Sequence, residues 1–320
     1  MLYTTDTIHQ LTVPTPFGVG DVHTYLLKGD SLTLVDAGIK TEEAWKALEA
    51  GLKEVGYTPQ DVEQIVLTHH HPDHIGLVDR FPNMIGLYGH EDNRKWLERD
   101  EPFLNRFRAF FLELYRQFGV GEEYQAFFKH LRDPLKYVGE GTLTKSLQEG
   151  DTIPGHKEWK VVATPGHAES HLSFFRAQDG TMLSGDHLLY HISSNPLLEP
   201  PRHPGGVRPK PLVTYRETME KCLSYPIKKV MPGHGPVFDG VHDIIRTRLQ
   251  KQEQRAQKVY DMLGAHSLTP FEVCQQLFPS HIKKEFGLTM SETVGQLDYL
   301  ESVQRVQVEK KDGIYYYTAV

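Results

Sequence analysis

Short apolar runs alternate with helical stretches in the first half of the chain. The run from residue 24 to 35 predicts a hairpin, with strands Thr24–Leu27 and Leu32–Val35 joined by a Gly-Asp turn. Thr41 is expected to cap a helix that carries Trp45, Leu48 and Leu52 on one stripe. Further strands are predicted in EQIVLTHHH, WKVVATPGH, TMLSGDH and KKVMPGH. This alternation indicates an α/β fold, either open or layered as αββα.

The pattern becomes purely helical between residues 91 and 137. Aromatic and leucine side chains recur there at steps of three and four residues, as at Phe103, Phe107, Phe110, Leu114 and Phe118. Such a stripe is typical of helix packing. It also suits a helical insert that covers an active site, with its aromatic side chains lining an acyl or aryl pocket.

The C-terminal part of the chain predicts a separate small domain. Residues 193–211 are rich in Pro and Gly and are too long for an ordinary connector, which indicates a functional loop or disorder. A long helix is predicted from 241 to 263, followed by two helices and a β-hairpin that turns at Asp312-Gly313. This order resembles a small winged-helix module. We therefore divide the chain into a catalytic domain, 1–240, with its insert at about 91–137, and a C-terminal domain, 241–320.

Composition narrows the class of protein. The 320 residues carry a net charge of −7, so no overall basic field attracts nucleic acid or an anionic membrane. No uninterrupted apolar run is long enough to span a bilayer, and the N-terminus does not read as a signal peptide. Only two cysteines occur, which suits a reducing cytoplasm. Histidine is unusually frequent, with 18 residues.

Histidine and aspartate follow the ends of five predicted strands. The strand LTLV ends at Asp36, IVLT runs into the segment HHHPDH at 69–74, and VVAT leads to His167. MLSG leads to Asp186 and KKVM leads to His234. The carboxyl ends of strands form the edge where α/β sheets gather their sites. Five strands ending in residue types that bind metals predict a metal centre at that edge.

The spacing within these segments supports this interpretation. His69 and His71 are two residues apart, so both imidazoles project to the same side of an extended chain. Pro72 is expected to discourage a helix there and to turn Asp73 and His74 toward a neighbouring position. Pro-Gly before His167 and His234 predicts tight turns in which backbone comes close beneath a ligand.

These segments resemble the motifs of the metallo-β-lactamase superfamily. THHHPDH fits its HxHxDH signature, and TPGHAESH, SGDH and MPGHGP fit the later motifs in order over roughly residues 10–240. The resemblance implies an αββα sandwich with two metals between its sheets. It assigns His69, His71 and His167 to the first metal, and Asp73, His74 and His234 to the second. Asp186 would bridge both metals, and Asp36 would orient a ligand histidine.

Differences from the motifs indicate which branch of the superfamily the chain resembles. No cysteine stands at a ligand position, which favours the hydrolases typified by glyoxalase II, lactonases and nucleases over true β-lactamases. The chain looks most like the glyoxalase II-like and LACTB-like branches. Imidazole and carboxylate ligands suit two Zn²⁺ ions per chain, and iron or manganese fits the same set.

The resemblance implies hydrolysis of a small ester, thioester or lactone by a hydroxide held between the metals. Asp73 is expected to carry the proton of the nucleophile, and Tyr190 to assist an oxyanion. Arg202, Arg208 and Lys210 form a basic cluster that suits a carboxylate or phosphate of a small substrate. The alternatives are an endoribonuclease or phosphodiesterase, an iron-dependent sulfur dioxygenase, and an inactive winged-helix regulator.

Charge argues against nucleic acid as the partner of the tail. Residues 257–320 hold six Lys and Arg against eight Asp and Glu, a balance of −2. The would-be recognition helix, 290–304, carries Glu292, Asp298 and Glu301 and no basic residue. We therefore expect no binding of duplex DNA or membranes, a small molecule as substrate, and a tail that serves dimerisation or domain packing.

Overall fold

The computed structural model describes residues 4–264 and 266–320. Its described residues group into two compact units. Unit 1 comprises residues up to 100, 134–194 and 222–242, and unit 2 comprises 101–133, 195–221 and 243–320. The division between residues 242 and 243 lies two residues after the predicted domain boundary, and the assignment of domains stays a prediction. The helical insert and the Pro-rich segment differ from the prediction, since both group with the C-terminal residues.

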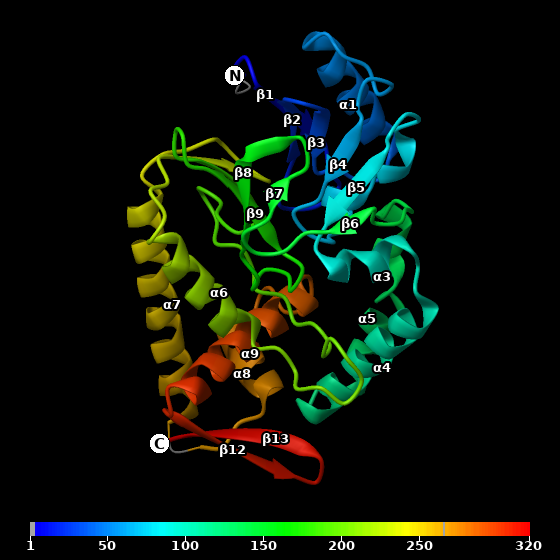
Figure 1. The fold of residues 1–320 in the computed structure, drawn as a ribbon. Coiled ribbons are helices and arrows are strands. Elements are labelled where there is room, and N and C mark those ends of the chain that lie inside the picture. The colour runs from blue at the N-terminus through cyan, green and yellow to red at the C-terminus, as the bar shows by residue number, and fades with distance from the viewer. Residues whose placement is uncertain (1–3, 265) are drawn as a thin grey trace. The chain divides into compact units, whose positions relative to one another are not determined.

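Unit 1 is built on two β-sheets that face one another (Figure 1). The first has the order β1-β2-β3-β4-β5-β6, and the second β11-β10-β9-β8-β7. The strands of the first sheet are β1 (Ile8–Val13), β2 (Val22–Lys28), β3 (Leu32–Val35), β4 (Gln64–Val66), β5 (Gly86–Gly89) and β6 (Lys145–Ser146). The strands of the second are β7 (Thr152–Ile153), β8 (His156–Ala163), β9 (Leu172–Arg176), β10 (Thr181–Gly185) and β11 (Lys229–Pro232).

Apolar side chains from both sheets form the core between them. Tyr25 and Val66 of the first sheet belong to one buried cluster with Trp159, Phe174 and Met231 of the second. The other face of the first sheet packs against helix α1 (Glu42–Glu54). Thr41 caps this helix by accepting a hydrogen bond from the amide of Ala44, as the sequence predicts. This layered sandwich confirms the predicted fold class. The loops at the ends of its strands carry the residues of the site.

The pairing of strands brings the predicted site segments to matching ends. Strand β3 pairs in parallel with β4, and β10 pairs in parallel with β11. Strand β8 runs in the direction of β10, because both pair antiparallel with β9. Parallel strands end at the same edge, so their following loops are neighbours.

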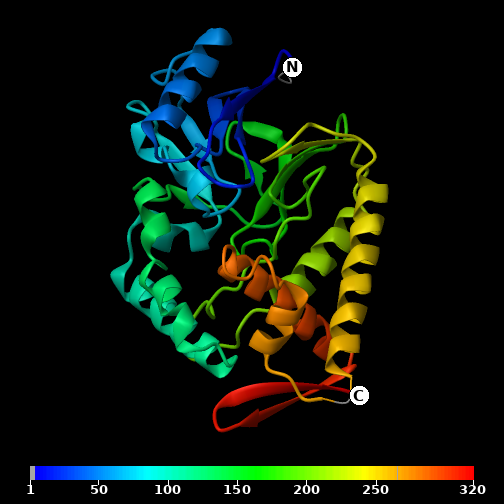
Figure 2. The same cartoon turned by 180° about the vertical axis from the view of Figure 1, so that it is seen from behind.

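Unit 2 is mainly helical. Helix α9 is its central helix: Phe286, Met290 and Val294 pack into one apolar cluster, and Leu297 and Leu300 into another. Figure 2 shows α9 in orange next to α8 and α7. The longer helices of the unit are α4 (Glu101–Gln117), α6 (Pro211–Cys222), α7 (Val241–Leu263), α8 (Pro270–Leu277) and α9 (Phe286–Ser302). A short helix, α5 (Gln125–Lys129), follows α4.

The predicted tail elements are present in the predicted order. Helices α8 and α9 are followed by the hairpin of β12 (Val306–Lys311) and β13 (Ile314–Ala319). Asp312 and Gly313 both have positive φ, at 50° and 82°, as a tight two-residue turn requires. The assignment of these elements to a winged helix stays a prediction.

Short segments complete the fold. They are the one-turn helices α2 (Pro72–Ile75) and α3 (Arg94–Leu97), and the 3-10 turns Val78–Arg80, Glu91–Asn93, Glu122–Tyr124 and Asp133–Tyr137. No helix among the described residues has both the length and the apolar character needed to cross a membrane.

Candidate metal centre

Five strands of unit 1 end at His or Asp, as the sequence predicts. Strand β3 ends immediately before Asp36, and β10 immediately before Asp186. His234 follows β11 by two residues. The segments that begin at His69 and contain His167 follow β4 and β8.

The segment HHHPDH differs from the prediction at Pro72. His71 is extended, with φ −67° and ψ 149°, and Pro72 begins the one-turn helix α2 that carries Asp73 and His74. The prediction that Pro72 discourages a helix is therefore wrong. Proline at the first helical position loses no hydrogen bond and already has a helical φ, so it starts a turn instead.

Three imidazole nitrogens meet at a first group. His69 Nε2 lies 3.0 Å from His71 Nδ1, and His167 Nε2 lies 2.9 Å from the same atom. The burial of these side chains and the neighbouring imidazoles lower the pKa of His69 and His71 well below the usual value. Both rings are therefore neutral near pH 7 and present lone pairs that suit a cation.

A second group joins Asp73, His74 and His234. The Oδ2 atom of Asp73 lies 3.3 Å from His234 Nε2. Asp186 connects the two groups: its Oδ1 lies 3.4 Å from His74 Nε2, and its Oδ2 lies 3.5 Å from the Nε2 atoms of both His167 and His234. Within each group the ligand atoms lie within 4.8 Å of one another. The structure thus brings the seven predicted ligands together in the expected groups, while their binding of metal stays a prediction.

Buried polar atoms without hydrogen bonds support a fit to metal. His74 Nε2, Asp186 Oδ1 and His234 Nε2 are buried and have no hydrogen-bond partner among the described residues. Buried polar atoms are costly to leave unsatisfied, and such atoms call for a ligand. All three are the atoms that would hold metal. Imidazole and carboxylate donors at these positions fit divalent transition metals.

In several of the predicted ligand histidines, the ring nitrogen opposite Nε2 is held by the chain. The carbonyl oxygen of Asp21 accepts a hydrogen bond of 2.7 Å from His234 Nδ1. The hydroxyl of Ser194 lies 2.8 Å from His167 Nδ1. Such contacts fix the orientation of a ring and leave Nε2 as the ligand atom.

Asp36 orients two histidines at once. It accepts hydrogen bonds from the amide and the hydroxyl of Thr68, at 2.7 and 2.8 Å, and from His74 Nδ1 at 2.8 Å. Because the Thr68 hydroxyl donates to Asp36, its oxygen accepts from His69 Nδ1 at 2.9 Å. Asp36 adopts a φ of 60°, in the left-handed region that Asp tolerates better than most residues. Asp36 thus contacts two predicted ligand histidines, one directly and one through Thr68, and its role behind the metal ligands stays a prediction.

Electrostatics of the second group favour a cation. Burial would lower the pKa of His234, but Asp186 and Asp73 raise the pKa to about 10. Burial would raise the pKa of the Asp186 carboxyl, but His234 and His74 hold it well below its usual value. Carboxylates therefore keep protons on these imidazoles when no metal competes.

Gly233 allows the β11 loop to approach Asp186. A Cβ atom at residue 233 would lie 2.2 Å from Asp186 Oδ1 and 2.9 Å from His74 Cε1. Such contacts are far below van der Waals distance, so only glycine fits. The predicted close approach of backbone before His234 is confirmed.

Comparisons with known proteins decide the family. The sequence profile described as "Metallo-beta-lactamase superfamily" matches residues 17–234. The chain belongs to the metallo-β-lactamase superfamily.

Full-length relatives agree with this assignment. A protein named "Probable metallo-hydrolase YqjP" from Bacillus subtilis is 44% identical over 303 residues, which cover 95% of each chain. The crystal structure of a metallo-beta-lactamase family protein, TTHA1429 from Thermus thermophilus, superposes with a TM-score of 0.82 at 27% identity and covers 99% of both chains. A more distant relative, "Atrochrysone carboxyl ACP thioesterase" from Aspergillus fumigatus, is 22% identical over 238 residues, 74% of this chain and 58% of that protein. The chain is therefore a metallo-hydrolase, and its fold implies a divalent-metal site.

The predicted substrate residues are not part of the two ligand groups. Tyr190 follows β10, is 45% exposed, and packs its ring against Phe238 and His191. Arg208 and Lys210 belong to unit 2, where they form ion pairs with Asp298 and Glu301. Arg202 is exposed in the same unit. The roles of these residues in binding substrate stay predictions. For Arg208, a substrate would have to compete with the buried carboxylate of Asp298 for the guanidinium.

Several supporting residues were missed in the sequence. His171 Nε2 accepts a hydrogen bond of 3.1 Å from the amide of Asp186, and its Nδ1 lies 2.8 Å from the Thr164 hydroxyl. A signal existed, since His171 ends the quoted motif TPGHAESH. Ser194 lies in the segment 193–211 that the sequence marks as a functional loop, but nothing in the sequence links it to His167, 27 residues away.

Proposed function

We propose that this metallo-hydrolase cleaves a small ester or thioester at a centre of two zinc ions. The observation that carries the proposal is the set of buried ligand atoms without hydrogen bonds, His74 Nε2, Asp186 Oδ1 and His234 Nε2, at the junction of two ligand groups. Two bound divalent ions would polarise a carbonyl group and lower the pKa of a water molecule toward neutrality.

The residues of the chain supply orientation and proton transfer. His69, His71 and His167 would hold one ion, Asp73, His74 and His234 the other, and Asp186 would touch both. Burial would raise the pKa of Asp73, but His74 and His234 outweigh burial and lower it. Asp73 is therefore ionised at neutral pH and able to accept a proton from a nucleophile. Tyr190 would donate its hydroxyl to the developing oxyanion.

A relative supports the acyl substrate class, and the ligand set argues only against a true β-lactamase. The thioesterase among the relatives acts on an acyl thioester by its name. The ligand set contains carboxylate and imidazole but no cysteine, since Cys222 and Cys274 are both buried outside it. We also propose a cytoplasmic location, because a chain with only two cysteines suits a reducing compartment.

The test combines metal analysis with a substrate screen. Protein purified without chelator and loaded with zinc is expected to hold two ions per chain and to turn over an aryl ester or acyl thioester. Asp186→Ala should lose at least one ion and lower kcat/KM by at least about a hundredfold. Asp179→Ala is the matched control, because Asp179 precedes the same strand and pairs with Arg176 at the surface.

Three outcomes would contradict the proposal. Absence of tightly bound transition metal would remove its basis. Cleavage of single-stranded RNA faster than the best ester, abolished by His71→Ala, would assign a nuclease. Activity that requires iron and oxygen with a persulfide substrate would assign a dioxygenase.

A further inference from the structure

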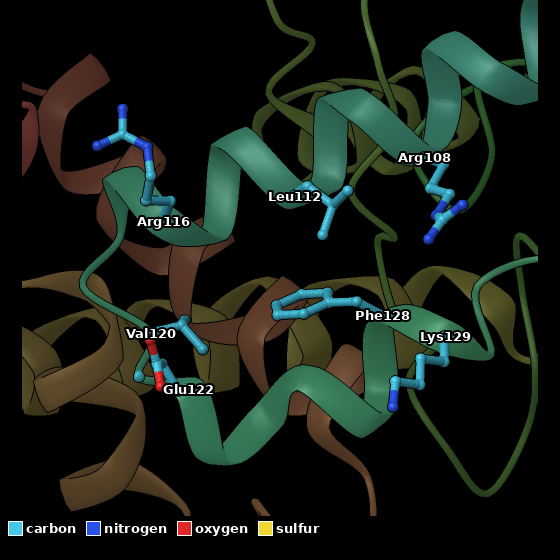
Figure 3. A pocket seen from close by; sticks show the side chains of 8 residues that line it. Arg108, Leu112, Arg116, Val120, Glu122, Phe128 and Lys129 are labelled. Atoms are coloured by element: carbon cyan, nitrogen blue, oxygen red, sulfur yellow. The ribbon is translucent and has the colours of Figure 1, made fainter.

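Unit 2 contains a cavity that the metal centre does not use. It has a volume of about 320 Å³ and is lined entirely by residues between 108 and 129, from α4, α5 and the turn that joins them (Figure 3). Small-molecule sites begin at about this size. The cavity therefore has room for a ligand of its own.

Helix α4 presents two different faces. Phe111, Leu114 and Tyr115 are buried in the core of unit 2. Arg108, Leu112 and Arg116 are spaced by four residues, so they share another face, and that face lines the cavity. Leu112 is 40% exposed on this face, so its side chain does not belong to the core of unit 2.

The cavity is apolar in the middle. Leu112 of α4 and Phe128 of α5 point toward one another across it, and Val120 continues the apolar lining (Figure 3). Phe128 and Val120 are only partly buried. An apolar group placed between Leu112 and Phe128 would remove all three side chains from water.

The charges are divided between the two ends. Arg108 and Lys129 lie at one end, and Glu122 lies at the other (Figure 3). Arg108 and Lys129 are exposed, and neither forms an ion pair among the side chains that the structure describes. Arg116 is different, because it binds both oxygens of Glu113, at 2.8 and 2.7 Å. Among the lining side chains that the structure describes, only Arg108 and Lys129 carry positive charge without an ion pair.

We propose that this cavity binds a medium-chain monocarboxylate. The carboxylate would lie between Arg108 and Lys129, and the alkyl chain would run between Leu112 and Phe128 toward Val120. A volume of about 320 Å³ holds roughly ten water-sized groups, which matches the ten non-hydrogen atoms of octanoate. Glu122 at the far end repels a second carboxylate, so a dicarboxylate of equal length binds more weakly.

The test titrates the full chain with octanoate carrying ¹³C in its carboxylate, and follows binding by NMR. We expect a dissociation constant of about 0.1–1 mM for a ligand of this size. The double substitution Arg108→Gln and Lys129→Gln should weaken binding at least tenfold. Arg116→Gln is the matched control on the same helix, and it should change affinity less than twofold because Glu113 already holds Arg116.

Two further arms separate this site from the metal centre. His71→Ala should leave octanoate binding intact, whereas a carboxylate bound at the metal centre would be lost. Octanedioate should bind less tightly than octanoate, and Glu122→Gln should reduce that difference. Equal weakening by Arg116→Gln, full retention of binding in the double variant, or loss of binding with His71→Ala would each overturn the proposal. None of these outcomes depends on the hydrolytic activity.

Discussion

The two units treat buried carboxylates in opposite ways. In unit 1, Asp186 lies between the ligand histidines, and its Oδ1 has no hydrogen bond among the described residues. In unit 2, Asp298 is fully buried, and both of its oxygens accept hydrogen bonds from the guanidinium of Arg208, at 2.8 and 2.5 Å. The first carboxylate adjoins histidines at 3.4–3.5 Å but keeps one oxygen without a hydrogen bond, and the second has both oxygens hydrogen-bonded within the protein.

The contrast between Asp186 and Asp298 distinguishes a candidate binding site from a structural ion pair. Both carboxylates are buried and both adjoin positively charged groups, so burial and charge alone do not distinguish them. What distinguishes them is whether the protein satisfies the buried oxygen atoms, because an unsatisfied one carries a large free-energy cost without a ligand.

The largest effect on stability is expected from breaking the pair in unit 2. Asp298→Ala leaves the charge of Arg208 largely buried and unpaired, which should lower the free energy of unfolding by about 3–5 kcal/mol. Denaturant titration measures this change. Glu301→Ala, one turn away on α9, is the control. Both side chains of the Glu301–Lys210 pair are more than one third exposed, so the loss of this pair should cost less than about 1 kcal/mol. Equal costs would contradict the contrast between the units.

The pair of Arg208 and Asp298 could not be predicted from the sequence. Arg208 and Lys210 form a basic cluster in the sequence, and their partners lie 90 and 91 residues further along the chain. A motif is readable when its chemistry is local, as in His69, His71 and Asp73. Partners that meet only through the tertiary fold leave no such pattern, so a structural pair resembles a binding cluster in the sequence.

The next effect concerns the contacts behind the metal ligands. Ser194→Ala removes the hydroxyl next to His167 Nδ1 and should lower metal affinity about 10- to 100-fold. Competition with a chromogenic chelator measures this affinity. Ser193→Ala is the control, since Ser193 is exposed and next in sequence. If both variants kept the affinity of the unsubstituted protein, Ser194 would have no part in holding the ring.

A third effect follows from the protons on the ligand histidines. The pKa of His234 is raised to about 10, so in the metal-free protein its ring is protonated at pH 7. Because a metal binds the neutral ring, metal binding must release this proton. For each proton released, the affinity for the metal should fall about tenfold for each pH unit below 10. Calorimetry of metal binding in two buffers with different ionisation enthalpies counts the protons. If metal binding released no proton at pH 7, the carboxylates would not keep the ligand histidines of the metal-free protein protonated.

Several strands were also missing from the sequence prediction, for a physical reason. Strand β1 buries His9 and Gln10 beside apolar residues, so it lacks the alternation of a half-buried strand. Strand β5, with the sequence GLYG, is short and has weak strand propensity. Strand β9 delivers no predicted ligand, so the pattern of His and Asp does not mark it. The strands that carry the site were predictable because their ends are marked by His and Asp.

The smallest effect compares helix caps in the two units. Thr41 of unit 1 accepts one hydrogen bond, from the amide of Ala44. Thr269 of unit 2 accepts from the amide of Glu272, while the Glu272 carboxylate accepts from the amide of Thr269 at 2.8 Å. Thr269→Ala removes one side of a reciprocal pair and should destabilise α8 by about 1 kcal/mol, against roughly half of that for Thr41→Ala in α1. Hydrogen exchange of the first-turn amides of each helix measures the two costs separately. Replacement of Thr269 by Ser should restore protection in α8, because the hydroxyl acceptor is retained, and a failure to do so would assign the loss to packing instead of capping.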